Sequence, residues 1–207
     1  MERTTRSGPT YHRRVPETDR LADARRILVY GVTGSGKSTL ARSLGELTRI
    51  PVTSVDDITW SPGWVPMPRA EQIEHFDELI RADRWILDAA YGAWRERVLE
   101  RADLVVALDY PRAVSLSRLL RRTAARLIDR REVCNGNRET LRNTFARDSI
   151  VVWHVHSFAP YRARMRAWAA AATGPPVILL HRPADARALV ESGGVAVRAP
   201  SLRHSPR

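Results

Sequence analysis

Residues 27–44 read ILVYGVTGSGKSTLARSL, and this stretch decides the fold. Its centre, GVTGSGKS at 31–38, fits the pattern G-x-x-x-x-G-K-[ST] and lies between an apolar run and an amphipathic run. A loop of this kind turns its backbone N–H groups inward around a phosphate, and the helix that follows adds the positive end of its dipole. The stretch therefore predicts a phosphate-binding loop between a buried strand and a helix.

Of the 34 Lys and Arg residues in the chain, only Lys37 is a lysine. An ammonium group on a flexible stem can enter a narrow loop that a planar guanidinium cannot. We expect Lys37 to bridge the β- and γ-phosphates of ATP, Ser38 to ligate Mg²⁺, and Thr39 to contact an α-phosphate. The alternative is a glycine-rich turn with an incidental lysine. The expected nucleotide-binding residues are Gly31, Thr33, Gly34, Ser35, Gly36, Lys37, Ser38 and Thr39.

The composition of the chain limits its class. It has 207 residues, 43% of them hydrophobic, which suffices for one domain with tails or at most a domain plus a small insert. No run is long enough to span a membrane, the N-terminal segment lacks the apolar stretch of a signal peptide, and Cys134 is the only cysteine. We therefore expect a cytoplasmic protein without disulfides or a cysteine-based metal site.

The net charge of +11 raises the question of a nucleic-acid partner. Much of this charge lies in two segments rich in Arg and Pro, residues 1–25 and 192–207, which we expect to be disordered tails. The expected domain between them spans residues 26–191. A nucleic acid bound through the basic tails is one candidate partner, and a general preference for Arg over Lys is the other explanation of the charge.

Between the tails, apolar runs alternate with amphipathic stretches, a pattern typical of a layered β/α domain. Because strands separated by helices make right-handed crossovers, the expected fold is α/β: a three-layer P-loop NTPase with a five-stranded parallel sheet, strand order 2-3-1-4-5 and helices on both faces. Strands are predicted at 26–31, 51–56, 84–89, 103–110 and 175–181. Helices are predicted at 37–48, 69–83, 94–102, 112–129, 138–156, 159–172 and 183–192.

Among nucleotide-binding P-loop proteins, the sequence favours a small kinase. A GTPase would normally read guanine with an Asn-Lys-x-Asp loop, which a chain without a second lysine cannot form. Motor and helicase domains need a larger core than a chain of this length provides. A small kinase needs ATP, Mg²⁺ and cationic side chains that close over the phosphates.

The stretch 112–129 supplies such cations on a predicted helix. Arg118, Arg122 and Arg126 recur every four residues and share one face, with Arg121 beside them. The stretch contains a single acid, so we expect an anion from outside the helix to complete these arginines. In a kinase that anion is the transferring phosphoryl group. The alternatives are a solvated basic face or one that binds RNA.

Four acids follow predicted strands on the side where open α/β sheets bind ligands: Asp56, Asp57, Asp88 and Asp109. In P-loop proteins a carboxylate that follows a neighbour of the loop strand holds Mg²⁺. With strand order 2-3-1-4-5 that residue is Asp88, and Asp109 is its rival. Asp56 or Asp57 would then face the acceptor, as general base or hydrogen-bond acceptor. Each of the four has the alternative role of a turn former or helix cap.

Aromatic and histidine residues are weaker candidates. Trp60 and Trp64 lie in a proline-rich loop and either stack on a planar ligand or pack against the helix predicted at 69–83. His154 and His156 are two apart on a predicted helix and point to different sides, which is poor geometry for a shared metal. The tryptophans expected to serve packing are Trp85, Trp153 and Trp168.

The segments GVTGSGKST, DDITWSPGW, WILDAAYG, ADLVVALDYPR and CNGNRETLR occur in this order along the chain. With them, residues 26–182 resemble the adenylate-kinase-like P-loop proteins that are often called DNA topology modulation proteins. The resemblance implies a nucleoside-monophosphate-kinase-like fold, ATP binding and phosphotransfer. Arg118 and Arg122 match the R-x-x-x-R spacing of lid arginines in adenylate-kinase relatives, and Asp88 matches the acid that ends their third strand.

The chain departs from that pattern after the third predicted strand. Asp88-Ala89-Ala90-Tyr91 stands where the resemblance leads us to expect Asp-Gly-Asn-Tyr. An Asn side chain that could contact the acceptor is therefore missing.

Two functional hypotheses follow from the sequence. The first is an ATP-dependent kinase that phosphorylates a nucleotide, a nucleoside or another hydroxyl-bearing metabolite. The second is a nucleotide-dependent nucleic-acid-binding or regulatory protein without kinase turnover. In both cases we expect a monomer or homodimer with no membrane partner. The catalytic residues expected under the first hypothesis are Lys37, Asp56, Asp88, Arg118 and Arg122.

Overall fold

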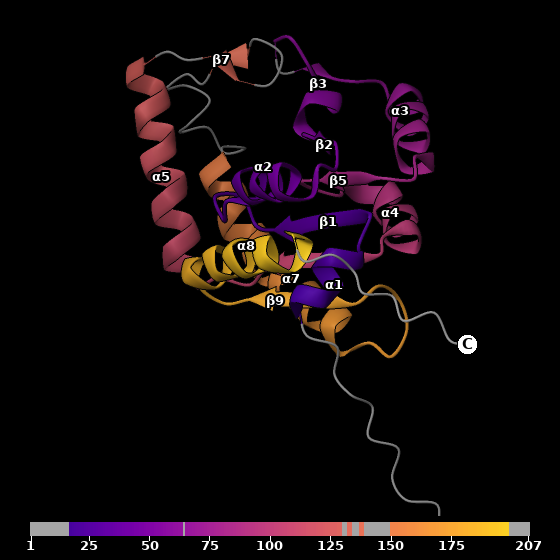
Figure 1. The fold of residues 1–207 in the computed structure, drawn as a ribbon. Coiled ribbons are helices and arrows are strands. Elements are labelled where there is room, and N and C mark those ends of the chain that lie inside the picture. Colours follow the sequence, from indigo (N-terminus) through magenta and orange to yellow (C-terminus); the bar gives the residue numbers. More distant parts are fainter. Residues whose placement is uncertain (1–16, 64, 130–131, 134–136, 139–149, 199–207) are drawn as a thin grey trace, which may run out of the picture.

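The structure of the protein is a computed structural model, and it describes residues 17–63, 65–129, 132–133, 137–138 and 150–198 (Figure 1). A parallel sheet lies at its centre, with helices on two faces. Within the described ranges, every helix is too short or too polar to cross a membrane.

The sheet holds five parallel strands in the order β2 (Val52–Thr53), β5 (Trp85–Leu87), β1 (Arg26–Gly31), β6 (Leu104–Leu108) and β9 (Val177–Leu180). β1 is central and pairs with β6 from Ile27↔Leu104 to Gly31↔Leu108. These are the predicted strands in the predicted order, so the predicted α/β fold is confirmed. The prediction succeeded because a parallel sheet buries both faces, which makes its strands apolar runs.

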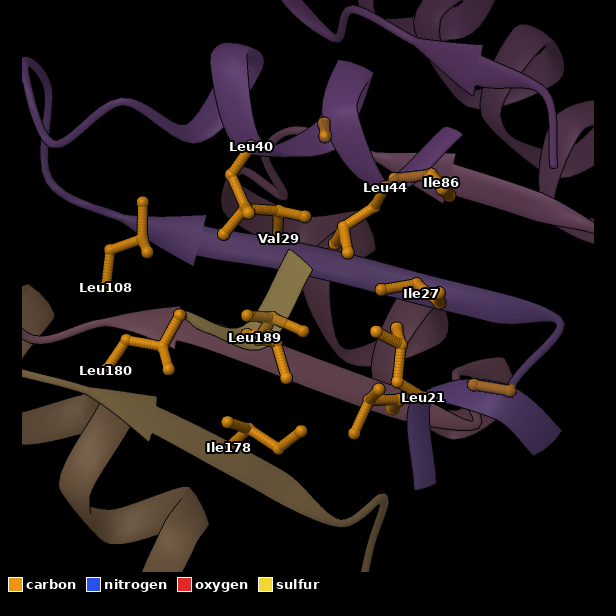
Figure 2. Close-up of a cluster of buried hydrophobic side chains, with 14 of the residues drawn as sticks. Leu21, Ile27, Val29, Leu40, Leu44, Ile86, Leu108, Ile178, Leu180 and Leu189 are labelled. Atoms are coloured by element: carbon orange, nitrogen blue, oxygen red, sulfur yellow. The ribbon is translucent and has the colours of Figure 1, made fainter. Parts of the chain in front are cut away.

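Alternate residues of β1 serve two separate cores. Ile27 and Val29 belong to the cluster under α1 (Glu17–Asp23), α2 (Lys37–Thr48) and α8 (Pro183–Arg198), part of which Figure 2 shows. Leu28 and Tyr30 belong to the cluster under α3 (Arg69–Arg81), α4 (Arg95–Arg101) and α7 (Ile150–Ala170). This alternation follows from the two-residue period of a strand and produces the three layers. The long helix α5 (Arg112–Asp129) follows β6 and runs along one side of the molecule (Figure 1).

The predicted disordered tails reach too far into the domain on both sides. Residues 17–25, predicted to belong to the N-terminal tail, contain α1, whose Leu21 is 0% exposed. At the other end α8 continues to Arg198, past the predicted boundary at 191. The two helices meet at Gly193, where an added Cβ would lie 2.7 Å from Cδ2 of Leu21. Residues 1–16 and 199–207 lie outside the described ranges.

The predicted second strand is shorter than expected. Only β2 is a strand in the range 51–56, and the 3₁₀ turn η1 (Asp56–Ile58) follows it. A small hairpin of β3 (Trp60–Ser61) and β4 (Val65–Pro66) then leads to α3. Between β5 and α4 the chain makes a second 3₁₀ turn, η2 (Gly92–Trp94).

The helices predicted at 138–156 and 159–172 are also corrected. A single helix, α7, begins at Ile150 and continues through Pro160, and residues 139–149 lie outside the described ranges. Asn137–Arg138 form β8, which pairs with β7 (Glu132–Val133) in place of the predicted helix start. Because proline has no N–H, Pro160 cannot donate the helical hydrogen bond to the carbonyl four residues earlier.

Candidate active site

The loop between β1 and α2 has the geometry of a phosphate-binding loop. Gly34 and Gly36 have φ angles of 77° and 99°, in the left-handed region where a Cβ is strained. A Cβ on Gly34 would also collide with the carbonyl oxygen of Ser115 and lie 2.9 Å from Cβ of Leu119, both on α5. The loop is therefore closed on one side by the helix that carries the predicted arginine stripe.

Lys37 is the first residue of α2 and reaches back over this loop. Its Nζ donates a hydrogen bond to the carbonyl oxygen of Val32 at 3.2 Å. Burial lowers the pKa of Lys37, the carboxylates of Asp56 and Asp88 oppose this, and the guanidinium of Arg122 adds to it. The ammonium group therefore lies among two acids and one other cation.

Asp88 connects the loop to the neighbouring strand. It directly follows β5, which pairs with β1, and its Oδ2 accepts a hydrogen bond from the Ser38 hydroxyl at 2.5 Å. Its Oδ1 accepts one from the backbone N–H of Val55 at 2.9 Å, and the residue is 4% exposed. Both carboxylate oxygens are therefore fixed, one of them against the hydroxyl expected to ligate a metal.

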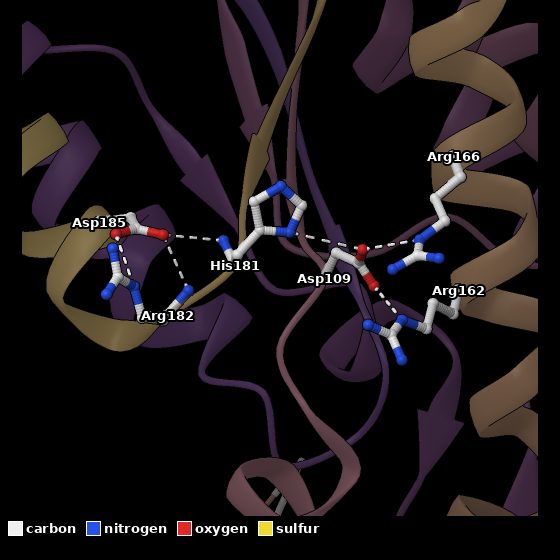
Figure 3. A network of polar contacts seen from close by, with 6 residues as sticks. All are labelled: Asp109, Arg162, Arg166, His181, Arg182 and Asp185. Carbon is white, nitrogen blue, oxygen red and sulfur yellow. Dashed lines mark hydrogen bonds and ion pairs between the residues drawn. The ribbon is translucent and has the colours of Figure 1, made fainter.

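Asp109, the rival carboxylate, faces a different set of partners (Figure 3). It follows β6 and accepts hydrogen bonds from Nε of Arg162 at 2.7 Å and Nε of Arg166 at 2.9 Å, both on α7. Nδ1 of His181 lies 3.6 Å from the same carboxylate. Asp185 completes the network by accepting from the backbone N–H groups of residues 181 and 182 at the start of α8. Asp109 thus joins α7 to the end of the sheet and does not line the cleft around the loop.

Asp56 and Asp57 are adjacent in sequence but differ in their position relative to the cleft. Asp56 lies in η1, lines the cleft and accepts a hydrogen bond at Oδ1 from the Tyr91 hydroxyl at 2.8 Å. Asp57 is exposed and does not line it. Burial, and then the charge and hydrogen bond of Asp56, raise the pKa of Tyr91 well above its ordinary value. Tyr91 therefore stays protonated and holds the Asp56 carboxylate in place.

The arginine stripe of α5 faces the same cleft. Arg118, Arg122 and Arg126 all line it, as their four-residue spacing predicts. NH1 of Arg118 donates to the carbonyl oxygen of Ser35 at 3.2 Å, so this arginine already touches the loop. Arg121 instead donates from Nε to the Ser117 carbonyl of its own helix at 3.3 Å and lies outside the cleft lining.

Around these groups lies a cleft of about 1520 Å³. Single-ligand pockets usually measure about 300–1000 Å³, so this cleft has room for two ligands. Its lining includes every predicted nucleotide-binding residue except Gly31, whose added Cβ would lie 2.8 Å from the Ser35 hydroxyl. Residues of α8 that the sequence did not single out form another wall, and they are Pro183, Ala186, Arg187, Val190 and Glu191.

The aromatic and histidine predictions have mixed outcomes. Trp85 is 2% exposed and the Trp168 ring centroid lies 4.7 Å from that of Tyr30, so packing is confirmed for both. For Trp153 packing is wrong, because it is 56% exposed and lines the cleft. His154 is buried against the Ser115 hydroxyl at 2.9 Å, and His156 lies on the exposed side of the helix, as expected. The Trp60 side chain and Trp64 lie outside the described parts.

The sheet order and the G-x-x-x-x-G-K-S loop between β1 and α2 define an α/β domain of the P-loop class. Neither a protein-family model nor a curated protein matches the chain.

Several solved structures have a similar fold. A gluconokinase from Sinorhizobium meliloti 1021 is 14% identical with a TM-score of 0.48, over 84% of this chain and 91% of that one. A shikimate kinase from Acinetobacter baumannii in complex with shikimate is 18% identical with a TM-score of 0.48, over 84% and 93%. A deoxyadenosine kinase from M. mycoides is 12% identical with a TM-score of 0.47, over 80% and 94%. This likeness concerns the fold and carries no information on the function of this chain.

Proposed function

We propose that the protein is an ATP-dependent kinase that transfers the γ-phosphoryl group of ATP to a hydroxyl-bearing small molecule. The acceptor is a nucleotide, a nucleoside or another hydroxyl metabolite. The observation that carries this proposal is the 2.5 Å contact between Ser38 and Asp88, in the same cleft as Lys37 and Asp56. A phosphate loop, a metal-binding pair and a separate carboxylate are the parts that phosphoryl transfer requires.

The loop side of the cleft would hold ATP. Backbone N–H groups of the loop and the positive end of the α2 dipole suit the phosphates, and Lys37 would bridge the β- and γ-phosphates. Ser38 and Asp88 offer a hydroxyl and a carboxylate, which are the hard oxygen ligands that Mg²⁺ takes. Among the described residues there is no cluster of three acids, His or Cys, which suits a metal that takes its other ligands from phosphates and water. When bound, Mg²⁺ would neutralise charge on the phosphate oxygens.

The other side of the cleft would hold the acceptor. Asp56 would accept the proton of the acceptor hydroxyl while that oxygen bonds to the γ-phosphorus and the bond from this phosphorus to the β-phosphate oxygen breaks. Arg118 and Arg122 would stabilise the charge on the equatorial oxygens of the transferring group. Tyr91 would keep Asp56 oriented through their 2.8 Å hydrogen bond.

The test is ADP formation from ATP and Mg²⁺ with a panel of nucleotides, nucleosides, sugars and shikimate-like acids. At least one panel member is expected to stimulate turnover, and Lys37→Ala is expected to abolish it. Arg97→Met is the control, because Arg97 pairs with Asp77 at 2.7 Å outside the cleft. If no panel member raises ADP formation above the Lys37→Ala level, the kinase proposal is wrong.

We also propose an adenylate-kinase-like activity, kinship with the DNA topology modulation proteins, a cytoplasmic location and a monomeric or homodimeric state. Sedimentation at several protein concentrations measures the last of these.

A second candidate is a nucleotide-dependent nucleic-acid-binding protein, which the net charge of +11 favours. Replacing the tail arginines by Ser in the full chain separates the two sources of binding, and these are Arg3, Arg6, Arg13, Arg14, Arg203 and Arg207. If DNA or RNA binding survives with a steep salt dependence, the domain itself is the binder. If binding disappears, the charge of the tails accounts for it.

A further inference from the structure

A second recess, of about 350 Å³, adjoins the cleft. One wall is the segment from Ala90 to Arg95, and the other is a face of α7 whose members are three or four residues apart. Tyr91 and Trp153 line both the cleft and the recess. Since the Tyr91 hydroxyl also bonds Asp56, the recess lies directly beside the proposed acceptor carboxylate.

The recess is basic. Arg95 and Arg164 line it, and no Asp or Glu does among the residues that the structure describes. The cleft, by contrast, contains the carboxylates of Asp56, Asp88 and Glu191 beside its lysine and arginines. A ligand that extends from Asp56 into the recess therefore passes from a carboxylate to two guanidinium groups.

Two tyrosines hold the Arg164 side chain in place. Its NH1 donates to the hydroxyl of Tyr30 at 2.9 Å, and its guanidinium carbon lies 5.6 Å from the centroid of the Tyr161 ring. Tyr30 is 1% exposed and stacks on Tyr161 with a centroid distance of 5.1 Å. This support leaves little side-chain freedom to lose when an anion binds. Arg95 is less available to an anion than Arg164, because its Nε and NH2 both donate to Oε1 of the neighbouring Glu96.

A buried hydroxyl also lines the recess. Ser157 is 7% exposed, and its Oγ has no hydrogen-bond partner in the described part of the protein. An unsatisfied buried hydroxyl is unfavourable, so a ligand oxygen that accepts from it would stabilise the complex. The recess thus offers a supported guanidinium and a free O–H donor in a lining that also includes Tyr91 and Tyr161.

We propose that this recess binds a carboxylate or phosphate group of the acceptor, while the acceptor's hydroxyl lies at Asp56. The substrate is then an organic anion whose carbon skeleton passes between Tyr91 and Trp153, and neutral sugars and nucleosides are poor substrates. This assignment rests on the kinase function proposed above. Arg164 and Ser157 would select the anionic group by charge-assisted hydrogen bonding, and they take no part in the phosphoryl transfer itself.

The test compares acceptors that differ only in the anionic group, using the full-length protein. Suitable pairs are gluconate with glucose, shikimate with its methyl ester, and a nucleoside monophosphate with its nucleoside. The anionic member of at least one pair is expected to have a kcat/KM about tenfold or more above that of its neutral partner. Equal or better use of the neutral members would overturn the proposal.

Substitutions test which residues bind the anionic group of the acceptor. Arg164→Met is expected to raise the acceptor KM about tenfold while the KM for ATP stays unchanged, which also reports that the cleft has folded. Arg164→Lys keeps the charge but loses the planar guanidinium with its paired N–H donors. Its acceptor KM should therefore lie between those of Arg164→Met and the wild type. Ser157→Ala should raise the acceptor KM by a smaller factor, and Arg97→Met should leave it unchanged. An acceptor KM that Arg164→Met does not move would contradict the assignment.

A binding experiment separates this proposal from the kinase function. Saturation-transfer NMR with gluconate, shikimate and inorganic phosphate, in the presence of a non-hydrolysable ATP analogue, needs no turnover. If the anions bind the wild type but not Arg164→Met, and no turnover is found, the kinase function and the acceptor assignment are refuted, whereas an anion site in the recess is supported. Turnover without anion binding would refute only the anion site in the recess. Binding of inorganic phosphate but not of the carboxylates identifies a phosphate as the preferred group.

Discussion

At the residue scale, Asp88 and Asp109 are two buried carboxylates on either side of the central strand. Asp88 follows β5 and bonds to Ser38 and to a backbone N–H, so its charge has no cationic hydrogen-bond partner among the described residues. Asp109 follows β6 and bonds to two guanidinium groups of α7. The two aspartates therefore have different partners, a hydroxyl and a backbone N–H at Asp88 and two guanidinium groups at Asp109.

Exchanging each carboxylate for an amide should separate these roles. Asp88→Asn is expected to lower ATP turnover about a hundredfold and to raise the Mg²⁺ concentration needed, because it removes a charge that would hold the metal. Asp109→Asn is expected to lower the free energy of unfolding by about 1–2 kcal/mol and to leave the KM for ATP unchanged, because its partners are partly exposed. Turnover across a Mg²⁺ series and urea unfolding measure the two effects. Loss of turnover in Asp109→Asn alone would reverse the assignment.

The lowered pKa of Lys37 has a measurable consequence for stability. Because burial lowers this pKa below its ordinary value of 10.5, the unfolded chain binds this proton more readily than the folded protein does. The charged ammonium therefore destabilises the fold at neutral pH, and this cost disappears as the pH rises towards 10.5. Lys37→Met is expected to be more stable than the wild type by an amount that shrinks over this window. Urea unfolding of both proteins at a series of pH values checks it, and a pH-independent difference would contradict it.

Tyr91 shows which residues of the candidate site a sequence motif can reveal and which it cannot. The loop residues, Asp88 and the arginine stripe were predictable, because each follows from a local pattern of spacing or strand position. Tyr91 was not selected, because a single tyrosine after a strand has no characteristic spacing. Its role appears only when η1 brings Asp56 within 2.8 Å of it.

At the scale of elements, α5 and the phosphate loop form one unit. The helix packs so closely on Gly34 that a Cβ there has no room, and Arg118 from the same helix bonds to the loop carbonyl of Ser35. The position of the arginines over the cleft is therefore fixed by a backbone contact. The four-residue spacing predicted the stripe, whereas the contact depends on how β6 delivers the helix and was not predictable.

Gly34→Ala tests this contact. The change adds left-handed strain and a collision with α5, so the free energy of unfolding is expected to fall by about 2–3 kcal/mol and ATP affinity to fall with it. Gly174→Ala is the matched control, because Gly174 has a φ of 98° with no atom near its added Cβ. It should lose about 1 kcal/mol from strain alone and bind ATP normally. Urea unfolding and calorimetric titration of ATP measure both, and equal effects of the two variants would refute the close contact.

The elements that the sequence misplaced share a physical cause. Strands were found because burial on both faces makes them continuous apolar runs, and α5 was found because its pattern is periodic. The helix α7 buries His154 and Ser157 beside Phe158 and Met165 and continues through a proline, so its polarity does not follow the helical period. Local sequence patterns therefore predicted the strands and α5 more accurately than they predicted α7, the helix that lines the recess.

At the scale of the whole molecule, the two ends of the described chain lie together. α1 and α8 pack on the same face of the sheet, next to α2, which begins at the phosphate loop (Figure 1). The N-terminal helix was mistaken for a tail because only Leu21 and Ala24 become buried in an otherwise polar segment. Those two residues join the core that also holds the central strand, so α1 is expected to contribute to global stability.

Leu21→Ala measures this contribution. Leu21 is 0% exposed and contacts the core beside α8, so truncation is expected to lower the free energy of unfolding by about 2–4 kcal/mol. Leu120→Ala is the control, because Leu120 is 48% exposed and should change stability by about 0.5 kcal/mol or less. Urea unfolding of the full-length variants, followed by both circular dichroism and tryptophan fluorescence, gives the two values. If Leu21→Ala unfolds like the wild type, residues 17–25 are a tail after all, and the domain begins at β1.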